Sequence, residues 1–169
     1  KSFCYFYLPL GSKVAINSVE NDWAEISLDK RNGKIGFVPS SHIVELNYKC
    51  KDWVAIAEQL VEVPYKWGGR DTVGIDCSAL IQLSYQSYGK NIPRNTVDQV
   101  KIKKQVIFDE KMLKRGCAIF WNGHVALMVD NENCLHANAY HMKTVIEPLE
   151  IVKKRMKESH KILRMMAED

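Results

Sequence analysis

The first part of the chain alternates apolar and polar residues in short runs that turn signals separate. Val14 and Ile16 fall on one side of the run LGSKVAINSV, and the run DWAEISL follows it. The Arg-Asn-Gly sequence at 31–33 is typical of a turn, and Pro39 ends a third run, KIGFVP. Several short strands within about 50 residues predict a small β-barrel.

Two later segments change to the helical period. In residues 51–63, apolar side chains recur at spacings of three and four, so they share one face of a helix that Pro64 should end. In GIDCSALIQLSYQSYG the same spacing predicts a helix of about three turns. Asp76 is a suitable N-cap and Gly89 a suitable C-cap. Cys77 therefore falls in the first turn, on the side that faces the core.

The segment CAIFWNGHVALMV predicts two strands around an Asn-Gly turn, the strongest short signal of a β-hairpin. His124 begins the second strand, and a further strand, ENCLHANAY, carries His136. If the loop between these strands is centred on Asp130, the two histidines lie opposite each other. If it is centred just after Asn131, His136 lies opposite Leu127 instead. The sequence leaves both registers open.

Composition and charge narrow the function classes. The 169 residues, 46% of them hydrophobic, suit one ordinary domain or a small domain joined to a medium one. Because no run of about 18 apolar residues occurs, we expect no membrane insertion. The net charge is +4, but acids are mixed with the basic clusters and the aromatic residues lie elsewhere. We therefore expect no nucleic-acid partner, and we expect a monomer.

The five cysteines are odd in number and widely spaced, which is not the pattern of a disulfide framework. Free thiols favour a reducing compartment. A zinc site is the alternative for one group of thiols and imidazoles: Cys117, His124, Cys134, His136 and His141. These residues lack the paired spacings of structural zinc sites, so we expect no metal.

The thiol of Cys77 has two interpretations. Cysteine is among the most buried residue types, so Cys77 can be a simple core residue. The free N–H groups and the dipole of a helix N-terminus, however, favour an anion, which predicts a lowered thiol pKa and a place for an oxyanion. A nucleophilic cysteine also needs a base. His124, oriented by His136, would complete that arrangement.

The motifs YKWGG, GIDCSALIQLSY, IPRNTVDQ, GHVALMV and LHA occur in this order over residues 65–140. Together they resemble the NlpC/p60-type cysteine peptidases of bacterial cell-wall metabolism. The resemblance implies an α+β, papain-like domain in which a nucleophile helix packs on an antiparallel sheet. The earlier run from V-x-I through DWAEI to IGFVPSSHI resembles a bacterial SH3 domain, a common neighbour of that peptidase domain. We expect an SH3-like domain at 1–46, with its first strand within 1–9, and a peptidase domain at 47–169.

The resemblance also implies roles for individual residues. Cys77 matches the nucleophile, His124 the general base and His136 the orienting member of a Cys-His-His triad. Tyr65 matches a tyrosine whose hydroxyl lies near the nucleophile and helps to bind the oxyanion. His141 is an alternative third member of the triad.

Substrate-binding residues are implied as well. Asp76 and Ser78 match positions that line the substrate site, and Asp76 is suited to accept a free peptide α-amine. In the branch that carries an SH3 module, a side chain of that module closes the pocket, and Tyr5 and Tyr7 are candidates for it. Cys117 stands where the family usually has an acid, and we interpret it as a thiol in the core of a strand.

The implied reaction is hydrolysis of a murein (peptidoglycan) stem peptide between D-glutamate and the diamino acid. It would pass through a thioester acyl-enzyme and need no cofactor. A same-fold amidase or acyltransferase and a non-catalytic wall-binding module are the alternatives. The chain begins at Lys1 with no signal-peptide pattern. We expect a cytoplasmic enzyme of murein recycling, or a shortened form of an exported protein.

Overall fold

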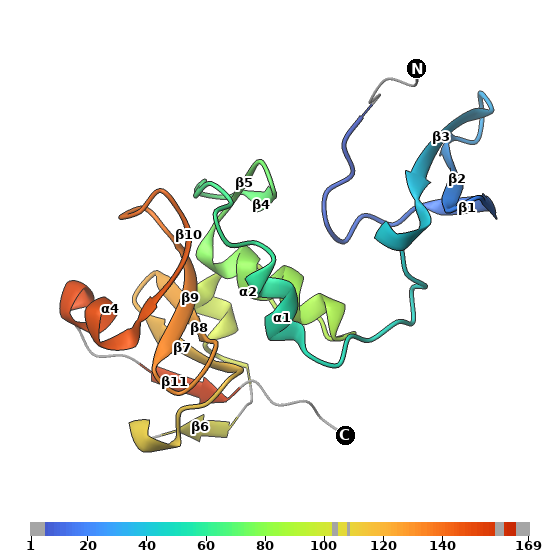
Figure 1. The fold of residues 1–169 in the computed structure, drawn as a ribbon. Helices are drawn as coiled ribbons and strands as arrows, with labels where there is room; N and C mark the ends of the chain where they lie inside the picture. Colours follow the sequence, from blue (N-terminus) through green and yellow to red (C-terminus); the bar gives the residue numbers. More distant parts are fainter. Residues whose placement is uncertain (1–5, 103–104, 108, 158–160, 165–169) are drawn as a thin grey trace. The chain divides into compact units, whose positions relative to one another are not determined.

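The structure is a computed structural model that describes residues 6–102, 105–107, 109–157 and 161–164 (Figure 1). The chain divides into two compact units, Lys1–Tyr48 and Lys49–Asp169. Among the described residues, no helix has the length and apolar character needed to cross a bilayer.

The first unit holds an antiparallel sheet of three strands in the order β1 (Ala15–Glu20), β2 (Trp23–Asp29) and β3 (Lys34–Pro39). The predicted turn at 31–33 joins β2 to β3, and its Gly33 has a φ of +64°, a conformation that glycine adopts without steric cost. Ala24 and Ile26 of the central strand are fully buried. A short 3-10 helix, η1 (Ser40–His42), follows β3.

The predicted SH3-like barrel is not confirmed. Residues 6–9 form no strand, and residues 1–5, which include Tyr5, lie outside the described residues. The side chain of Tyr7 is about half exposed. The sheet also leaves several large apolar side chains exposed: Ile16, Val19, Trp23, Ile35 and Phe37. The barrel and its pocket-closing residue stay predictions.

The second unit is built on a six-stranded sheet. Its strands lie in the order β10 (Lys143–Pro148), β9 (Asn133–Asn138), β8 (His124–Met128), β7 (Cys117–Trp121), β11 (Lys161–Arg164) and β6 (Gln105–Ile107). Neighbouring strands pair antiparallel throughout. The helices of this unit are α1 (Trp53–Glu58), α2 (Cys77–Ser87), α3 (Thr96–Gln99) and α4 (Leu149–Met156), with a 3-10 turn, η2 (Glu110–Met112), before β7.

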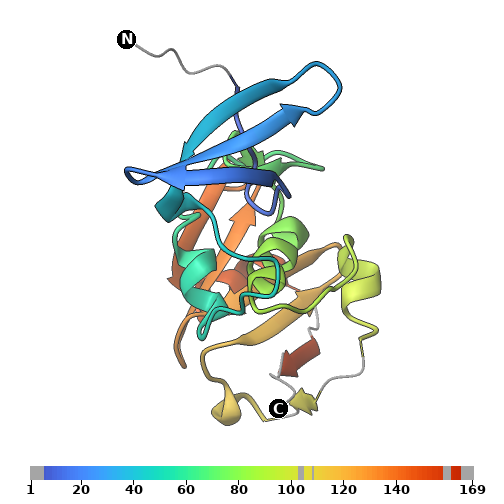
Figure 2. The ribbon, with the colours of Figure 1, turned by 90° about the vertical axis from the view of Figure 1, so that its right-hand side faces the viewer.

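The strand residues alternate between two apolar clusters, one on each face of the sheet. Val125 and Leu127 belong to the cluster with α1 and α2, whereas Ala126 and Met128 belong to the cluster with α4. This is the period of two that an extended backbone imposes. Figure 2 shows α1 and α2 together on one side of the central strands. The mixed helix and sheet content is the α+β arrangement that the sequence predicts.

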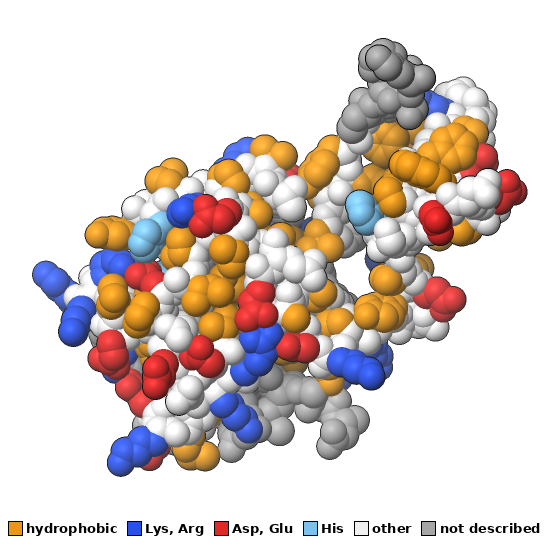
Figure 3. Space-filling model, in the orientation of Figure 1, with side chains coloured by type: hydrophobic (Ala, Val, Ile, Leu, Met, Phe, Trp, Pro, Cys, Tyr) orange, Lys and Arg blue, Asp and Glu red, His pale blue; other side chains and the backbone are white. Residues whose placement is uncertain are grey.

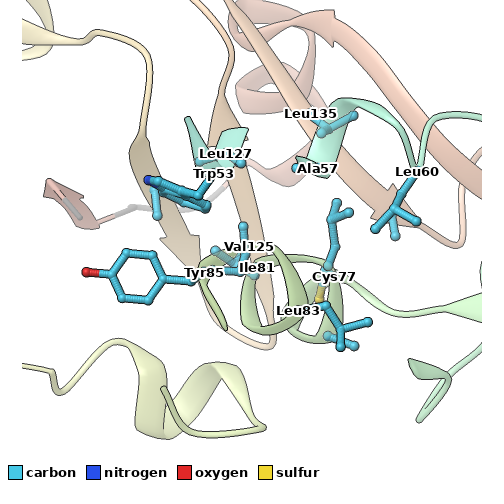
Figure 4. Close-up of a cluster of buried hydrophobic side chains, with 14 of the residues drawn as sticks. Trp53, Ala57, Leu60, Cys77, Ile81, Leu83, Tyr85, Val125, Leu127 and Leu135 are labelled. Carbon is cyan, nitrogen blue, oxygen red and sulfur yellow. The ribbon is translucent and has the colours of Figure 1, made fainter. Parts of the chain in front are cut away.

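Helix α2 is buried almost all round rather than along one stripe. Its residues from Cys77 to Tyr85 are all buried, and it packs on β8, β9 and α1. Figure 4 shows Cys77, Ile81 and Tyr85 of this helix among the side chains of the first cluster. The predicted end of the helix is confirmed, because Gly89 follows the last turn with a φ of +79°. A buried helix holds its N-terminus in a fixed place, which a catalytic group requires.

The helix predicted for residues 51–63 is shorter than expected. Asp52 caps it by accepting hydrogen bonds from two backbone N–H groups, and it ends at Glu58 instead of near Pro64. Glu62 adopts a φ of +70°, its N–H donates to the carbonyl of Thr144, and the carbonyl of Val63 accepts from Thr144. The chain therefore leaves the helix early because its backbone pairs with β10.

Surface charge is mixed on the side of the second unit that Figure 3 shows. Acidic and basic side chains are interspersed there. The second unit contains several ion pairs, such as Arg115 with Asp52 and Glu58, and Lys143 with Glu62. Exposed pairs of this kind contribute about 0–1 kcal/mol each, so the apolar clusters carry most of the stability.

Because α2 is buried, a cavity made in it should lower the free energy of unfolding. Leu80 is fully buried, so Leu80→Ala should lower the free energy of unfolding by about 2–5 kcal/mol in urea denaturation. Val97, which is 55% exposed, is the control, and Val97→Ala should change that free energy by about 0.5 kcal/mol or less. Equal effects of the two substitutions would contradict this packing.

Candidate active site

Cys77 opens α2 directly after its N-cap. Oδ1 of Asp76 accepts a hydrogen bond from the backbone N–H of Ala79 at 2.8 Å, which satisfies one donor that lacks an intrahelical partner. The predicted N-cap is therefore confirmed. A short ribbon of β4 (Arg70–Asp71) and β5 (Gly74–Ile75) leads into the cap.

The Asp76 carboxylate joins three segments of the chain. Arg94 donates to Oδ1 at 2.8 Å and to Oδ2 at 2.6 Å, while Gly68 N–H donates to Oδ2 at 3.0 Å. Burial alone would raise the pKa of Asp76, but the hydrogen bonds from Arg94 and Ala79 outweigh it and lower the pKa. The carboxylate is thus ionised, and it holds the YKWGG loop and the IPRNT segment against the start of α2.

Ser78 lies inside the same network. Its hydroxyl donates to Oδ1 of Asp76 at 3.1 Å and accepts from Arg94 at 2.8 Å. The loop on the other side depends on glycine, because a Cβ at Gly69 would collide with the carbonyl group of Gly74. Asp76, Cys77 and Ser78, three of the predicted site residues, therefore share one hydrogen-bonded corner of the unit.

Cys77 is 7% exposed, and burial raises the pKa of its thiol to about 11. The N–H of Val125 lowers the pKa in part, whereas the charge of Asp76 raises it further. The predicted lowering of the thiol pKa is therefore wrong, because desolvation of the thiolate outweighs the helix N-terminus. The interaction with the N–H of Val125 also places the sulfur beside β8, and Val125 directly follows His124 in that strand.

Tyr65 approaches the same corner from the YKWGG loop. Its backbone forms a bridge with Ile75, and its N–H donates to the carbonyl of Met142 at 2.9 Å. Burial raises the pKa of the hydroxyl, and the electrostatic effects of Cys77 and Asp76 raise it further. The residue is partly buried, and its hydroxyl is a neutral donor within electrostatic reach of the thiol.

Neither predicted register of the histidine strands is correct. Leu127 pairs with Leu135, and Met128 pairs with Cys134. This register places His136 opposite Ala126, on the diagonal from His124, because the connecting loop is centred on Asn131. Diagonal neighbours in a sheet lie within reach of long side chains.

The two imidazoles are in direct contact across that diagonal. Nε2 of His124 lies 2.8 Å from Nδ1 of His136. On its other side, Nε2 of His136 lies 2.8 Å from Oε1 of Glu147, which in turn binds Arg155 through both carboxylate oxygens at 2.7 and 2.8 Å. Four side chains from β8, β9, β10 and α4 thus form one continuous hydrogen-bonded series.

Burial keeps both imidazoles neutral. It lowers the pKa of His124 to about 3, and the charges of His136 and Arg155 lower that pKa further. Burial also lowers the pKa of His136, against the opposing effect of Glu147. Hydrogen bonds from Arg155 hold the pKa of Glu147 at about 2. At neutral pH the free site therefore contains a thiol, two neutral imidazoles and the ionised carboxylates of Asp76 and Glu147.

The remaining predicted residues have other partners. His141 hydrogen-bonds Asn138 through its backbone N–H at 2.9 Å and its Nδ1 at 3.1 Å. Cys117 is fully buried in β7, which confirms it as a strand-core thiol. Within the described part of the chain, no group of three or more His, Cys, Asp or Glu side chains is placed to hold a metal ion.

Sequence reasoning missed Glu147 and Arg155. Val145 pairs with His136 and Glu147 pairs with Cys134, so Glu147 lies diagonal to His136 in the same way as His124. The sequence does hold a signal for Glu147 in the next hairpin along the chain. If the turn of that hairpin is placed at 139–142, the strand pairing puts Glu147 on the same face of the sheet as the histidines. Arg155 gives no such signal, because it comes from a helix after the sheet.

The raised thiol pKa predicts how Cys77 reacts with iodoacetamide. Alkylation depends on the thiolate fraction, so its rate, followed by mass spectrometry of the Cys77 peptide, should keep rising past the pH of about 8.5 at which a free thiol is half ionised. Glutathione treated in parallel is the reference. A rate that is already constant below about pH 7 would contradict this prediction, because it would indicate a thiolate–imidazolium pair in the free protein.

Comparisons with known proteins identify the family. Residues 62–161 match the model of the NlpC/P60 family. Dipeptidyl-peptidase 6 of Lysinibacillus sphaericus is 30% identical over 126 residues, which cover 69% of this chain and 45% of that protein. Gamma-D-glutamyl-L-lysine dipeptidyl-peptidase of Bacillus subtilis strain 168 is 30% identical over 112 residues, which cover 60% of this chain and 37% of that protein.

A solved structure shows the same fold. The crystal structure of an NlpC/P60 family protein from Bacillus cereus superimposes with a TM-score of 0.76 at 20% identity, over 92% of this chain and 54% of that one. The match to the curated relatives spans less than half of their own length. Because the family model covers more than half of the chain and includes both histidine strands and the start of α2, this chain belongs to the NlpC/P60 family.

Proposed function

We propose that this chain is a cysteine peptidase that hydrolyses murein stem peptides at the bond between D-glutamate and the diamino acid. The observation that carries the proposal is the direct contact of His124 with His136 at 2.8 Å, beside the strand whose Val125 N–H meets the Cys77 sulfur. A nucleophile, a base and an orienting partner are the three parts of a cysteine hydrolase site.

The reaction begins from a neutral pair. Because the pKa of Cys77 is raised to about 11 and that of His124 is lowered to about 3, the thiolate does not form in advance. His124 takes the thiol proton as the sulfur attacks the peptide carbonyl, and the new S–C bond forms at that moment. His136 holds the ring of His124 in the orientation for this transfer.

The proposal also assigns groups to the oxyanion and to the leaving amine. The backbone N–H of Cys77, at the start of α2, and the hydroxyl of Tyr65 donate to the oxyanion. His124, now protonated, gives its proton to the leaving amine as the C–N bond breaks, which leaves a thioester on Cys77. Water, deprotonated by His124, then hydrolyses the thioester and restores the thiol.

The choice of substrate rests on the relatives. One of them is named a gamma-D-glutamyl-L-lysine dipeptidyl-peptidase, and a dipeptidyl-peptidase acts near a free N-terminus. Asp76 and Ser78 are the proposed binding residues for that end of the peptide. The Asp76 carboxylate already accepts from Arg94, so an incoming ammonium group would share this carboxylate with the guanidinium or take its place.

Removal of the thiol tests the nucleophile. On a defined murein peptide, L-Ala-γ-D-Glu-diamino acid, Cys77→Ala should lower kcat by about 10⁴-fold or more, measured by chromatography of the products. Cys50 is also buried but lies at the other end of α2, beside Ser87, and Cys50→Ala should retain activity within about twofold. Full activity of Cys77→Ala would overturn the proposal, and so would a wild-type protein that binds the peptide without cleaving it.

The same assay separates a hydrolase from a transferase. With a competing amine in the reaction, a hydrolase releases the free acid as its main product. An amide formed with the added amine as the main product would instead assign the chain to the acyltransferases.

Blocking the peptide's N-terminus tests the role of Asp76. Acetylation removes the ammonium group and with it a hydrogen bond to a buried charge, so kcat/KM should fall about 10- to 100-fold, as expected for about 1.5–3 kcal/mol. The free and acetylated peptides of identical sequence form the matched pair. Equal hydrolysis of both peptides would show that Asp76 does not anchor the amine.

A further inference from the structure

The hydrogen-bonded series does not end at the histidine pair. His136 is 1% exposed, and its Nε2 lies 2.8 Å from Oε1 of Glu147. The side chain of Glu147 is 12% exposed. A carboxylate in such surroundings stays charged only when it is paired and hydrogen-bonded.

Arg155 supplies that pairing from α4. Its two terminal nitrogens donate to the two oxygens of Glu147 at 2.7 and 2.8 Å, a bidentate geometry that fixes the plane of the carboxylate. The guanidinium also lies over the ring of Tyr140, 4.1 Å from its centre. Two further titratable groups face Glu147. His141 Nδ1 lies 3.8 Å from Oε1, and Cys134 is the register partner of Glu147 on β9, with a buried thiol whose pKa is raised. Glu147 is therefore held in place and held as an anion.

An anion at this position decides which atom donates and which accepts in each hydrogen bond of the series. An ionised carboxylate only accepts hydrogen bonds, so Nε2 of His136 must carry a proton and donate it. In the neutral ring, Nδ1 of His136 then accepts, and its partner, Nε2 of His124, must donate. The remaining lone pair of the two rings falls on Nδ1 of His124. Without the anion, both rings could take the opposite tautomer, and Nδ1 of His124 would carry a proton and could not act as a base.

We propose that Glu147 is a positioning residue that selects the tautomer of both histidines and so leaves Nδ1 of His124 free to accept a proton. The inference rests on the proposed function for its effect on rate, but the tautomers themselves can be measured without any substrate. Arg155 acts one step further away, by keeping Glu147 ionised and oriented. Neither residue touches the reacting atoms.

A purely structural role for Glu147 makes a different prediction. The Glu147–Arg155 pair also ties α4 to β10, and loss of that tie would lower stability without changing the imidazole protons. Glu110 provides the matched control, because it pairs with Lys153 of the same helix at 2.7 Å and lies outside the histidine series. Glu110→Gln removes a carboxylate of α4's ion pairs and leaves Glu147 in place.

The experiment compares wild type, Glu147→Gln and Glu110→Gln in two measurements. The first is nitrogen-15 NMR of the histidine side chains in the full chain at neutral pH. Wild type and Glu110→Gln should show Nδ1 of both rings unprotonated and Nε2 protonated, whereas Glu147→Gln should show a mixture of tautomers at His124. The second is peptide hydrolysis, in which Glu147→Gln should lower kcat about 10- to 100-fold, part of the gain that a positioned base supplies, with KM changed less than about twofold.

The outcomes decide between a tautomer-selecting role and a purely structural role for Glu147. A protonated Nδ1 on His124 or His136 in the wild type would overturn the inference, and so would wild-type tautomers and kcat in Glu147→Gln. If Glu147→Gln and Glu110→Gln lower kcat alike while the tautomers stay unchanged, Glu147 is only a structural tie between α4 and β10. If wild type cleaves no murein peptide but shows the expected tautomers, the proposed function fails and the tautomer assignment stands.

Discussion

The site depends first on the carboxylate of Asp76. One side chain caps α2 through Ala79, receives Gly68 of the YKWGG loop, and binds both nitrogens of Arg94. These groups come from three separate segments of the chain, and a buried carboxylate would be costly if any of its partners were missing. The position of Cys77, next in the chain, is therefore set by a charge that the fold must neutralise.

Burial then determines the chemistry of the groups around it. It raises the pKa of Cys77 to about 11 and lowers that of His124 to about 3, so the resting site carries no thiolate–imidazolium pair. The anionic member of the histidine series is Glu147, and Arg155 keeps it charged. The charges of the site are thus carried by the carboxylates of Asp76 and Glu147 and their arginine partners, whereas Cys77 and the two imidazoles are neutral.

Local patterns predicted the parts of the fold that local physics decides. The N-cap at Asp76, the glycine after α2 and the Asn-Gly hairpin before His124 follow from capping and turn chemistry, and all three are confirmed. The predicted length of α1 was wrong because Glu62 and Val63, which the prediction placed in the helix, pair with β10, a contact distant in sequence. The strand register was wrong because it depends on the centre of one loop, to within a single residue. The prediction of a lowered pKa for Cys77 was wrong because burial dominates it. A helix N-terminus can be recognised in a sequence, whereas the extent of burial cannot.

The most direct test of the account is to observe the acyl-enzyme on Cys77. The protein is mixed with the peptide L-Ala-γ-D-Glu-diamino acid, quenched in acid at times from milliseconds to seconds, and analysed by mass spectrometry of the intact protein and its peptides. The account predicts a transient mass increase equal to the L-Ala-γ-D-Glu acyl group, located on the Cys77 peptide and absent in Cys77→Ala. An acyl group on another residue, or turnover during which Cys77 is never modified, would contradict it.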